Sequence, residues 1–319
     1  MQRGIDVIMM IIFKNVIYVF LIFAVNLAVC SYLINKVSAR SELRKGFTAS
    51  RAGGLGYPFL EISKYLAKSS RLGIWEIFLL FFSFFIWTVI PFSQTLILIK
   101  VDSDLLVAVL FYIVLVFFFM VNASNSSYGF VWNNFLKKVL MMFSIFIPML
   151  FSIASLVLIN RTLNLREIVG FQYQYWNIIY QPLGFILMFT SAFVQFKLTG
   201  LVRKNTILFS ENSEKEGAGF GRLITRVSNY STLFFLLVII VILYLAGWQN
   251  LFFVNGNIMF ILKFYILFFL ILLLDKATPR LDDYNYLISI NWKFIVPVSA
   301  VNFILTIVFF ILRNIYNLI

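Results

Sequence analysis

The sequence predicts an all-α, polytopic membrane protein with about eight transmembrane helices and two long loops on one side of the membrane. The first observation is composition: hydrophobic residues make up 62% of the chain and charged residues only 12%, about half the charged share of a typical soluble domain. The second is that apolar stretches of about 20 residues, the length that crosses a hydrocarbon core, recur along the whole chain.

Eight apolar stretches are each long enough to form a membrane-spanning helix. Backbone groups cannot remain unpaired in lipid, and a helix satisfies them within a single segment. We expect spans at 8–35, 74–99, 104–122, 139–160, 175–196, 232–253, 257–275 and 294–317. We expect these helices to form a single transmembrane domain over residues 1–319.

Lys and Arg are distributed unevenly between the two sets of loops. The loops after the odd-numbered spans hold 19 of them, and the loops after the even-numbered spans hold 3. Basic residues are retained on the cytoplasmic or matrix side, so the odd-numbered loops are predicted there and both termini on the opposite side. The net charge of +13 is therefore interpreted through membrane topology and anionic lipid rather than through nucleic acid.

The first long loop on the basic side, residues 36–73, contains a predicted amphipathic helix. Pro58 suits the first turn of a helix, and residues 59–68 place apolar side chains on one face and charged ones, including Glu61 and Lys64, on the other. We expect this helix to lie at the membrane surface. The loop is either a solvated connection or part of a docking surface or site entrance.

The second long loop on this side, residues 197–231, is polar and has the same two interpretations, a solvated connection or part of a docking surface or site entrance.

Elsewhere the chain lacks the groups that most enzymes use. It has no His, one cysteine (Cys30), no Walker loop and no dinucleotide fingerprint, so it offers no metal ligand set and binds no redox cofactor itself. No Asp or Glu lies well inside a span, which argues against a stand-alone transporter. Lys14 and Lys263 are the deepest charges, and we expect them to reach an interface.

Six short motifs follow one another in the order of a single family. They are Arg44-Lys45-Gly46 with Gly54-Leu55, Pro58, Glu61 and Lys64; Ala123-Ser124-Asn125-Ser126-Ser127-Tyr128; Glu167-Ile168-Val169 with Gln172 and Trp176; Pro182-Leu183-Gly184-Phe185; Gly247-Trp248; and Pro279-Arg280 with Tyr284, Leu287 and Trp292-Lys293. Together they resemble chain 1 of mitochondrial NADH-ubiquinone oxidoreductase and its bacterial counterpart, over most of the chain from about residue 36.

This resemblance implies a membrane-arm subunit of respiratory complex I, placed where that arm meets the matrix arm. Such a protein contributes to the quinone chamber and to the coupling of quinone reduction to proton translocation, with ubiquinone as substrate of the complex and no complete active site of its own. The implied partners are iron–sulfur subunits, other membrane-arm subunits and membrane lipids, but no nucleic acid. The implied location is the mitochondrial inner membrane or a bacterial plasma membrane. Candidates for the polar end of the chamber are Arg44, Glu61, Lys64, Glu216 and Arg280.

Several charged residues of that family are replaced in this chain. The aligned positions hold Ile34, Phe135, Ser144, Val194, Leu201, Lys204, Thr206, Leu208 and Asn285. These departures argue against proton coupling through this chain. A homologous subunit of a membrane-bound hydrogenase and a degenerate structural subunit therefore remain alternatives. If the chamber persists, we expect Glu61, Glu216 and Arg280 to approach one another on the basic side, with Arg280 keeping a carboxylate ionised.

The loop charges lead to a topological prediction. In sealed membrane vesicles, protease should cleave the segments 36–73 and 197–231 only when it is added on the basic side of the membrane. Mass mapping of the fragments from right-side-out and inverted vesicles checks this. Cleavage of either segment from the opposite side contradicts the orientation.

Overall fold

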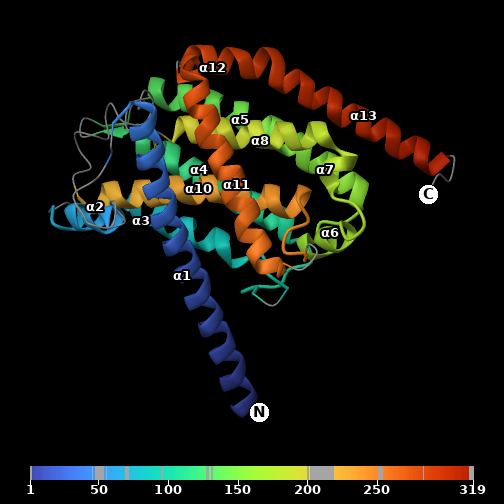
Figure 1. Ribbon diagram of the computed structural model, residues 1–319, viewed down its shortest axis with the longest axis horizontal. Helices are drawn as coiled ribbons and strands as arrows, with labels where there is room; N and C mark the ends of the chain where they lie inside the picture. The colour runs from blue at the N-terminus through green and yellow to red at the C-terminus, as the bar shows by residue number, and fades with distance from the viewer. Residues whose placement is uncertain are drawn as a thin grey trace.

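The chain folds almost entirely into helices (Figure 1). The computed structural model describes residues 2–44, 46, 54, 56–68, 72–94, 96–126, 129–130, 132–199, 201, 219–250, 254–282 and 284–315. Its α-helices are α1 (Gln2–Ser41), α2 (Tyr57–Leu66), α3 (Ile74–Phe85), α4 (Asp104–Ser124), α5 (Trp132–Asn160), α6 (Leu165–Phe171), α7 (Asn177–Tyr180), α8 (Pro182–Leu198), α10 (Phe220–Tyr244), α11 (Gly256–Ala277), α12 (Tyr284–Ile290) and α13 (Val296–Ile315). Short elements complete it: 3-10 helices η1 (Ile86–Thr88) and η2 (Pro279–Asp282), the π-helix η3 (Asn291–Ile295), and paired strands β1 (Asn125–Ser126) and β2 (Gly129–Phe130).

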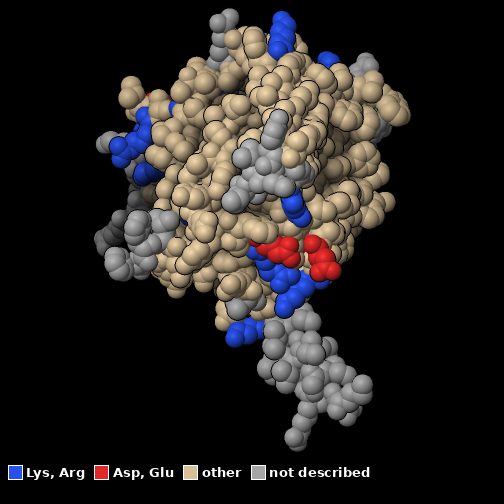
Figure 2. All heavy atoms as spheres, turned by 90° about the vertical axis from the view of Figure 1, so that its right-hand side faces the viewer, with Lys and Arg blue, Asp and Glu red and all other residues tan. Residues whose placement is uncertain are grey.

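Among the described residues, eight apolar helices occupy the eight predicted places in order. Six are long and apolar enough to cross a membrane: Phe13–Ser41, Asp104–Asn122, Phe135–Asn160, Phe220–Tyr244, Gly256–Ala277 and Asn285–Leu312. Two are shorter, Ile74–Thr88 and Pro182–Leu198. Uncharged side chains also cover most of the face seen in Figure 2, where charged ones gather in small groups. The predicted all-α polytopic fold is therefore confirmed.

Several helix ends differ from their predicted positions, and in two spans a proline explains the difference. The predicted span 74–99 stops being helical after Thr88, because Pro91 has no backbone N–H and disfavours a helical conformation at the residue before it. The predicted span 175–196 begins as a continuous helix only at Pro182, a residue that suits the first helical position.

Helix α10 shows the largest difference, since it covers Phe220–Tyr244 instead of the predicted 232–253. Its end is fixed by Ala246 and Gly247, which adopt left-handed backbone conformations with φ of 57° and 45°. Its start extends into the predicted loop 197–231, whose last twelve residues are therefore helical. Side chains at its start consequently project from an ordered helix.

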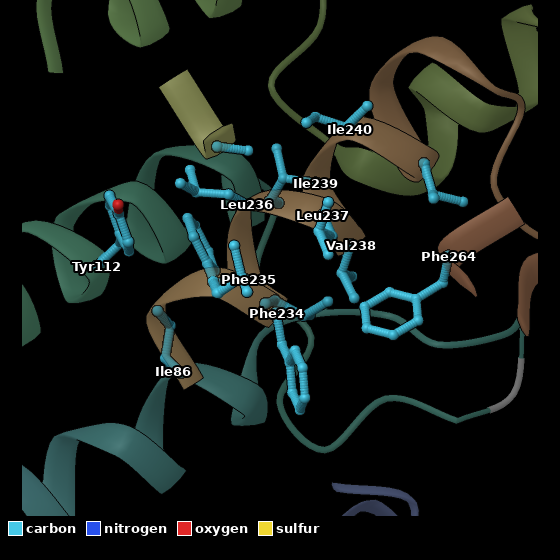
Figure 3. Close-up of a cluster of buried hydrophobic side chains, with 14 of the residues drawn as sticks. Ile86, Tyr112, Phe234, Phe235, Leu236, Leu237, Val238, Ile239, Ile240 and Phe264 are labelled. Atoms are coloured by element: carbon cyan, nitrogen blue, oxygen red, sulfur yellow. The ribbon is translucent and has the colours of Figure 1, made fainter. Parts of the chain in front are cut away.

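The core is built around α10, which Figure 1 shows passing through the middle of the helices. Of its most apolar stretch, 94% is buried inside the structure. A helix that is apolar on all sides is stable only when it is enclosed, and the run of buried side chains in Figure 3 comes from this helix. In contrast, only 17% of the residues in the most apolar stretch of the last span, Asn285–Leu312, are buried.

Small residues allow α3 and α10 to lie close together. Ser231 donates a hydrogen bond to the carbonyl of Ser83 (2.7 Å) and accepts one from Trp87 Nε1 (3.0 Å). Near the start of α10, a Cβ on Gly221 would lie 2.2 Å from Oε1 of Glu76. Small residues at such positions are typical of helix pairs in membranes, where close backbone approach stabilises association.

Lys263 lies inside the bundle and reaches toward the end of α10, and its expected position at a membrane interface stays a prediction. It is only 5% exposed. Its Nζ donates to the carbonyl oxygens of Leu245 (2.5 Å) and Gly247 (3.1 Å) and lies 4.8 Å from the ring centroid of Trp176. These carbonyls follow the end of α10, so Lys263 joins α11 to that end.

Packing around Gly184 leads to a prediction about stability. A Cβ there would lie 2.7 Å from the hydroxyl of Tyr244 and 2.8 Å from Cδ of Gln181, and both of these side chains are buried. Gly184→Leu should therefore destabilise the bundle by about 1–3 kcal/mol through overpacking. The thermal unfolding midpoint of the purified protein measures this. Gly170→Leu is the control, because nothing lies within 4 Å of the Cβ position at Gly170. Equal midpoints for the two variants would contradict the role of Gly184.

Candidate functional site

Helix α2 contributes one wall of a small cavity. Pro58 stands in its first turn as predicted, and the helix packs against α1 and α10. Pro58, Glu61, Ile62 and Tyr65 line the cavity. They recur at the spacing of one helical face. Glu61 therefore shares the inward face with apolar residues, in contrast to the predicted separation.

The inward position of Glu61 is explained by Arg226 on α10. Arg226 Nη1 forms an ion pair and hydrogen bond with Glu61 Oε1 and also donates to the hydroxyl of Tyr65 at 3.1 Å. The side chains of Arg226 and Glu61 are 26% and 16% exposed. A charge-assisted contact of this kind is stronger than a neutral hydrogen bond and fixes α2 against α10 across a gap of 165 residues in sequence.

The cavity itself has a volume of about 240 Å³ and lies between α1, α2, α3 and α10. Its apolar walls include Phe20 and Phe23 of α1, Phe84 of α3 and Val227 of α10. Its polar groups are concentrated at the Glu61–Arg226 pair and at nearby tyrosines. A mostly apolar cavity with a few polar groups is the usual form of a small-molecule site.

Tyr230 supplies a further polar group at the cavity. It lies one helical turn beyond Arg226, lines the cavity and is only 1% exposed. Its hydroxyl interacts with the Arg226 side chain. Because a guanidinium only donates hydrogen bonds, the hydroxyl hydrogen of Tyr230 is not used by Arg226, and a ligand with an acceptor oxygen suits it.

Of the five residues predicted for the site, the structure places only Glu61 at the cavity. The Arg44 side chain is 71% exposed and its Nε lies 3.5 Å from Glu42, while Lys64 is exposed and does not line the cavity. Glu216 and the side chain of Arg280 lie outside the described residues. The predicted cluster of Glu61, Glu216 and Arg280 therefore stays a prediction, whereas the described partner of Glu61 is Arg226.

The polar groups that accompany Glu61 at the cavity, Tyr65, Arg226 and Tyr230, were not predicted as site residues from the sequence. A signal was present, since Arg226 and Tyr230 are four residues apart and so share a helical face. It was missed because residues 197–231 were assigned to a loop, where such spacing has no meaning.

A second charged group lies between the ends of α8 and α11. Lys197 Nζ contacts Asp275 Oδ1 at 2.7 Å, and Lys276 Nζ contacts Asp275 Oδ2 at 3.2 Å. Lys197 also donates to the carbonyls of Asp275 and Thr278. Because the charges and carbonyls satisfy one another, we interpret this buried group as a structural connection between the two helices.

The Glu61–Arg226 contact leads to a prediction about local stability. Glu61→Gln removes one charge of the pair, so α2 should open more easily, and the amides of 57–66 should exchange hydrogen about tenfold faster or more. Hydrogen exchange with mass spectrometry measures this in the purified protein. Lys64→Gln is the matched control on the same helix, because Lys64 is exposed. Identical exchange in the two variants would show that the pair does not hold α2.

Comparison with known proteins identifies the family. The family model described as NADH dehydrogenase matches residues 14–307. In Bacillus cytotoxicus, the NADH-quinone oxidoreductase component designated H is 30% identical over 189 residues, which is 58% of this chain and 56% of the relative. The same component of Bacillus cereus gives the same values. The alignment thus spans little more than half the length of these relatives. Because the family model matches most of the sequence, the chain belongs to the NADH dehydrogenase family.

Proposed function

We propose that the chain is a membrane-arm subunit of an NADH-quinone oxidoreductase, and that the cavity between α1, α2, α3 and α10 receives the quinone headgroup. Two observations support this proposal. The relatives from Bacillus are named as a component of that enzyme. The cavity is mostly apolar, and its polar groups include the Glu61–Arg226 pair and the adjacent Tyr65 and Tyr230.

The chemistry of a quinone matches this arrangement of groups. Its ring is apolar and its two carbonyl oxygens accept hydrogen bonds, so it suits apolar walls with a donor at one end. Tyr230 donates its hydroxyl hydrogen to one carbonyl, while its oxygen faces the guanidinium of Arg226. The cavity of about 240 Å³ is at the small end of ligand sites, which favours the headgroup rather than the whole molecule.

Arg226 stabilises the quinone during reduction. Two electrons and two protons convert a quinone to a quinol, and negative charge develops on the oxygens before the protons arrive. A fixed guanidinium beside the ring lowers the free energy of that charge in a site of low dielectric constant. Glu61 and Tyr65 hold the guanidinium in place and keep it from turning toward lipid headgroups. The electrons come from a partner protein of the complex, because this chain has no motif for a redox cofactor.

We infer that this chain contributes walls and hydrogen bonds rather than a relay of carboxylates. Ile34 and Val194, which stand where the resembled family has acids, are buried in apolar clusters. Ser144, at another such position, accepts a hydrogen bond from Asn291 of η3. None of these three side chains ionises, so protons coupled to quinone reduction would have to move through other subunits.

The alternative assignments differ in partners and in chemistry. If the chain belonged to a hydrogenase-type complex, it would copurify with a hydrogenase instead of with the subunits that oxidise NADH. A degenerate structural subunit would tolerate changes in the cavity without loss of quinone reduction. Identifying the partner chains in the gently extracted complex distinguishes the hydrogenase-type alternative from the proposed function. The variants described below distinguish the structural-subunit alternative from it.

Tyr230 provides the sharpest test of the proposed function. Tyr230→Phe keeps the ring but removes the donor, so kcat/KM for quinone should fall roughly three- to tenfold while the amount of assembled complex is unchanged. Steady-state quinone reduction by the isolated complex measures this.

The matched control is Tyr112→Phe. Tyr112 is fully buried like Tyr230, but it lies on α4 and does not line the cavity. Equal activity of both variants and the unmodified complex would refute the assignment of the cavity to quinone.

A further inference from the structure

A second and larger cavity lies beside the first. Its volume is about 500 Å³, and it is bounded by α1, the segment 87–96, α10 and α11. Its walls are mainly apolar and aromatic, with Phe92, Phe234, Phe260 and Phe264 among them. The proposed quinone site does not use this space.

The depth of this cavity follows from the lengths of α1 and α11. Lys36 follows Lys14 by 22 residues on α1, a rise of about 33 Å at about 1.5 Å per residue. Lys276 follows Asn257 by 19 residues on α11, a rise of about 29 Å. Both lengths match a hydrocarbon core of about 30 Å, so Lys14 and Asn257 lie at the same membrane interface, opposite the basic loops.

Polar groups stand at this end of the cavity. Asn257 and Ser93 line it, and Tyr18 does so as well. Lys14 is exposed one helical turn before Tyr18, with its Nζ 5.7 Å from the ring centroid of that tyrosine. Lys14 has no carboxylate partner among the described residues, so its charge is available to an anion from outside the chain.

At the other end of the cavity, Tyr265 donates a hydrogen bond to Oδ1 of Asn26 at 2.6 Å, which joins α11 to α1. The lining residues run from Tyr18 to Asn26 on α1 and from Asn257 to Tyr265 on α11, a rise of about 12 Å on each helix. The cavity therefore extends from the polar groups near the interface toward the middle of the membrane, and it takes most of the depth of one leaflet.

We propose that this cavity binds one phospholipid from the leaflet opposite the basic loops. One acyl chain fills the space between α1 and α11, and the phosphate lies on Lys14 with Asn257 nearby. Phospholipid meets both requirements because it carries an anionic phosphate at the interface and an apolar chain at the required depth.

The bound lipid has a consequence for the neighbouring cavity. Phe23 lines both cavities, and its ring centroid lies 5.7 Å from that of Trp87 and 5.9 Å from that of Phe234. An acyl chain on one side of Phe23 keeps the ring against these partners, so the lipid forms part of the support for the wall of the smaller cavity. This consequence rests on the lipid site and not on the identity of the ligand in the smaller cavity.

The test counts phospholipids that stay with the complex during detergent washing, by native mass spectrometry and lipid extraction. Ile261→Trp places a large side chain into the cavity from α11, so this variant should retain one phospholipid fewer per complex. Lys14→Glu reverses the charge at the phosphate, so it should release the same phospholipid about tenfold faster.

The matched controls are Leu262→Trp, which is exposed on the same helix and does not line the cavity, and Lys100→Glu, an exposed lysine in the connection before α4. Both should retain phospholipid as the unmodified complex does. The proposal would be overturned if Ile261→Trp or Lys14→Glu retained the phospholipid, or if a variant and its control lost phospholipid equally. Recovery of a quinone or a protein segment from this cavity would also overturn it.

Discussion

Helix α10 is enclosed by other helices along its second half, and most of the remaining architecture depends on this enclosure. Most of its backbone hydrogen bonds are internal, so it needs mainly apolar contact from its neighbours. Polar contacts supplement this packing, since Ser231 connects it to α3 and Gln195 of α8 donates to Thr232 at 3.2 Å. At its end, the carbonyls of Ile242 and Leu243 accept hydrogen bonds from Gln172 and Asn177. Its first half emerges from this enclosure and carries Arg226 and Tyr230 to the smaller cavity. One helix thus supplies both the centre of the core and the polar groups of the site.

The number and order of the apolar helices were predictable from the sequence, because a bilayer requires long apolar runs wherever it is crossed. Helix ends were less predictable, since they depend on local features such as Pro91 and on the left-handed conformations at Ala246 and Gly247. The start of α10 was missed for a different reason. Its polar residues contact distant parts of the chain, as Arg226 does with Glu61 of α2, 165 residues away in the sequence.

The candidate site was only partly predictable from the sequence, as its two charged residues show. Glu61 was found because a family motif marks its position, while Arg226 belongs to none of the six motifs. Arg44 and Lys64 occupy matching motif positions but are exposed in the described structure, and neither lines the cavity. A motif marks positions in the sequence but not the contacts of their side chains, so it predicted Glu61 without its partner.

Lys263 has a consequence for the order in which the chain enters the membrane. Every group that contacts its ammonium in the described structure, the two carbonyls after α10 and the ring of Trp176, precedes it in the sequence. During translation, these partner groups are therefore synthesised before Lys263. An isolated helix would expose this lysine to lipid at a cost of several kcal/mol, whereas α11 entering together with α10 as a hairpin finds the carbonyls already present. The cation that destabilises α11 alone thereby favours pairwise insertion of these two helices.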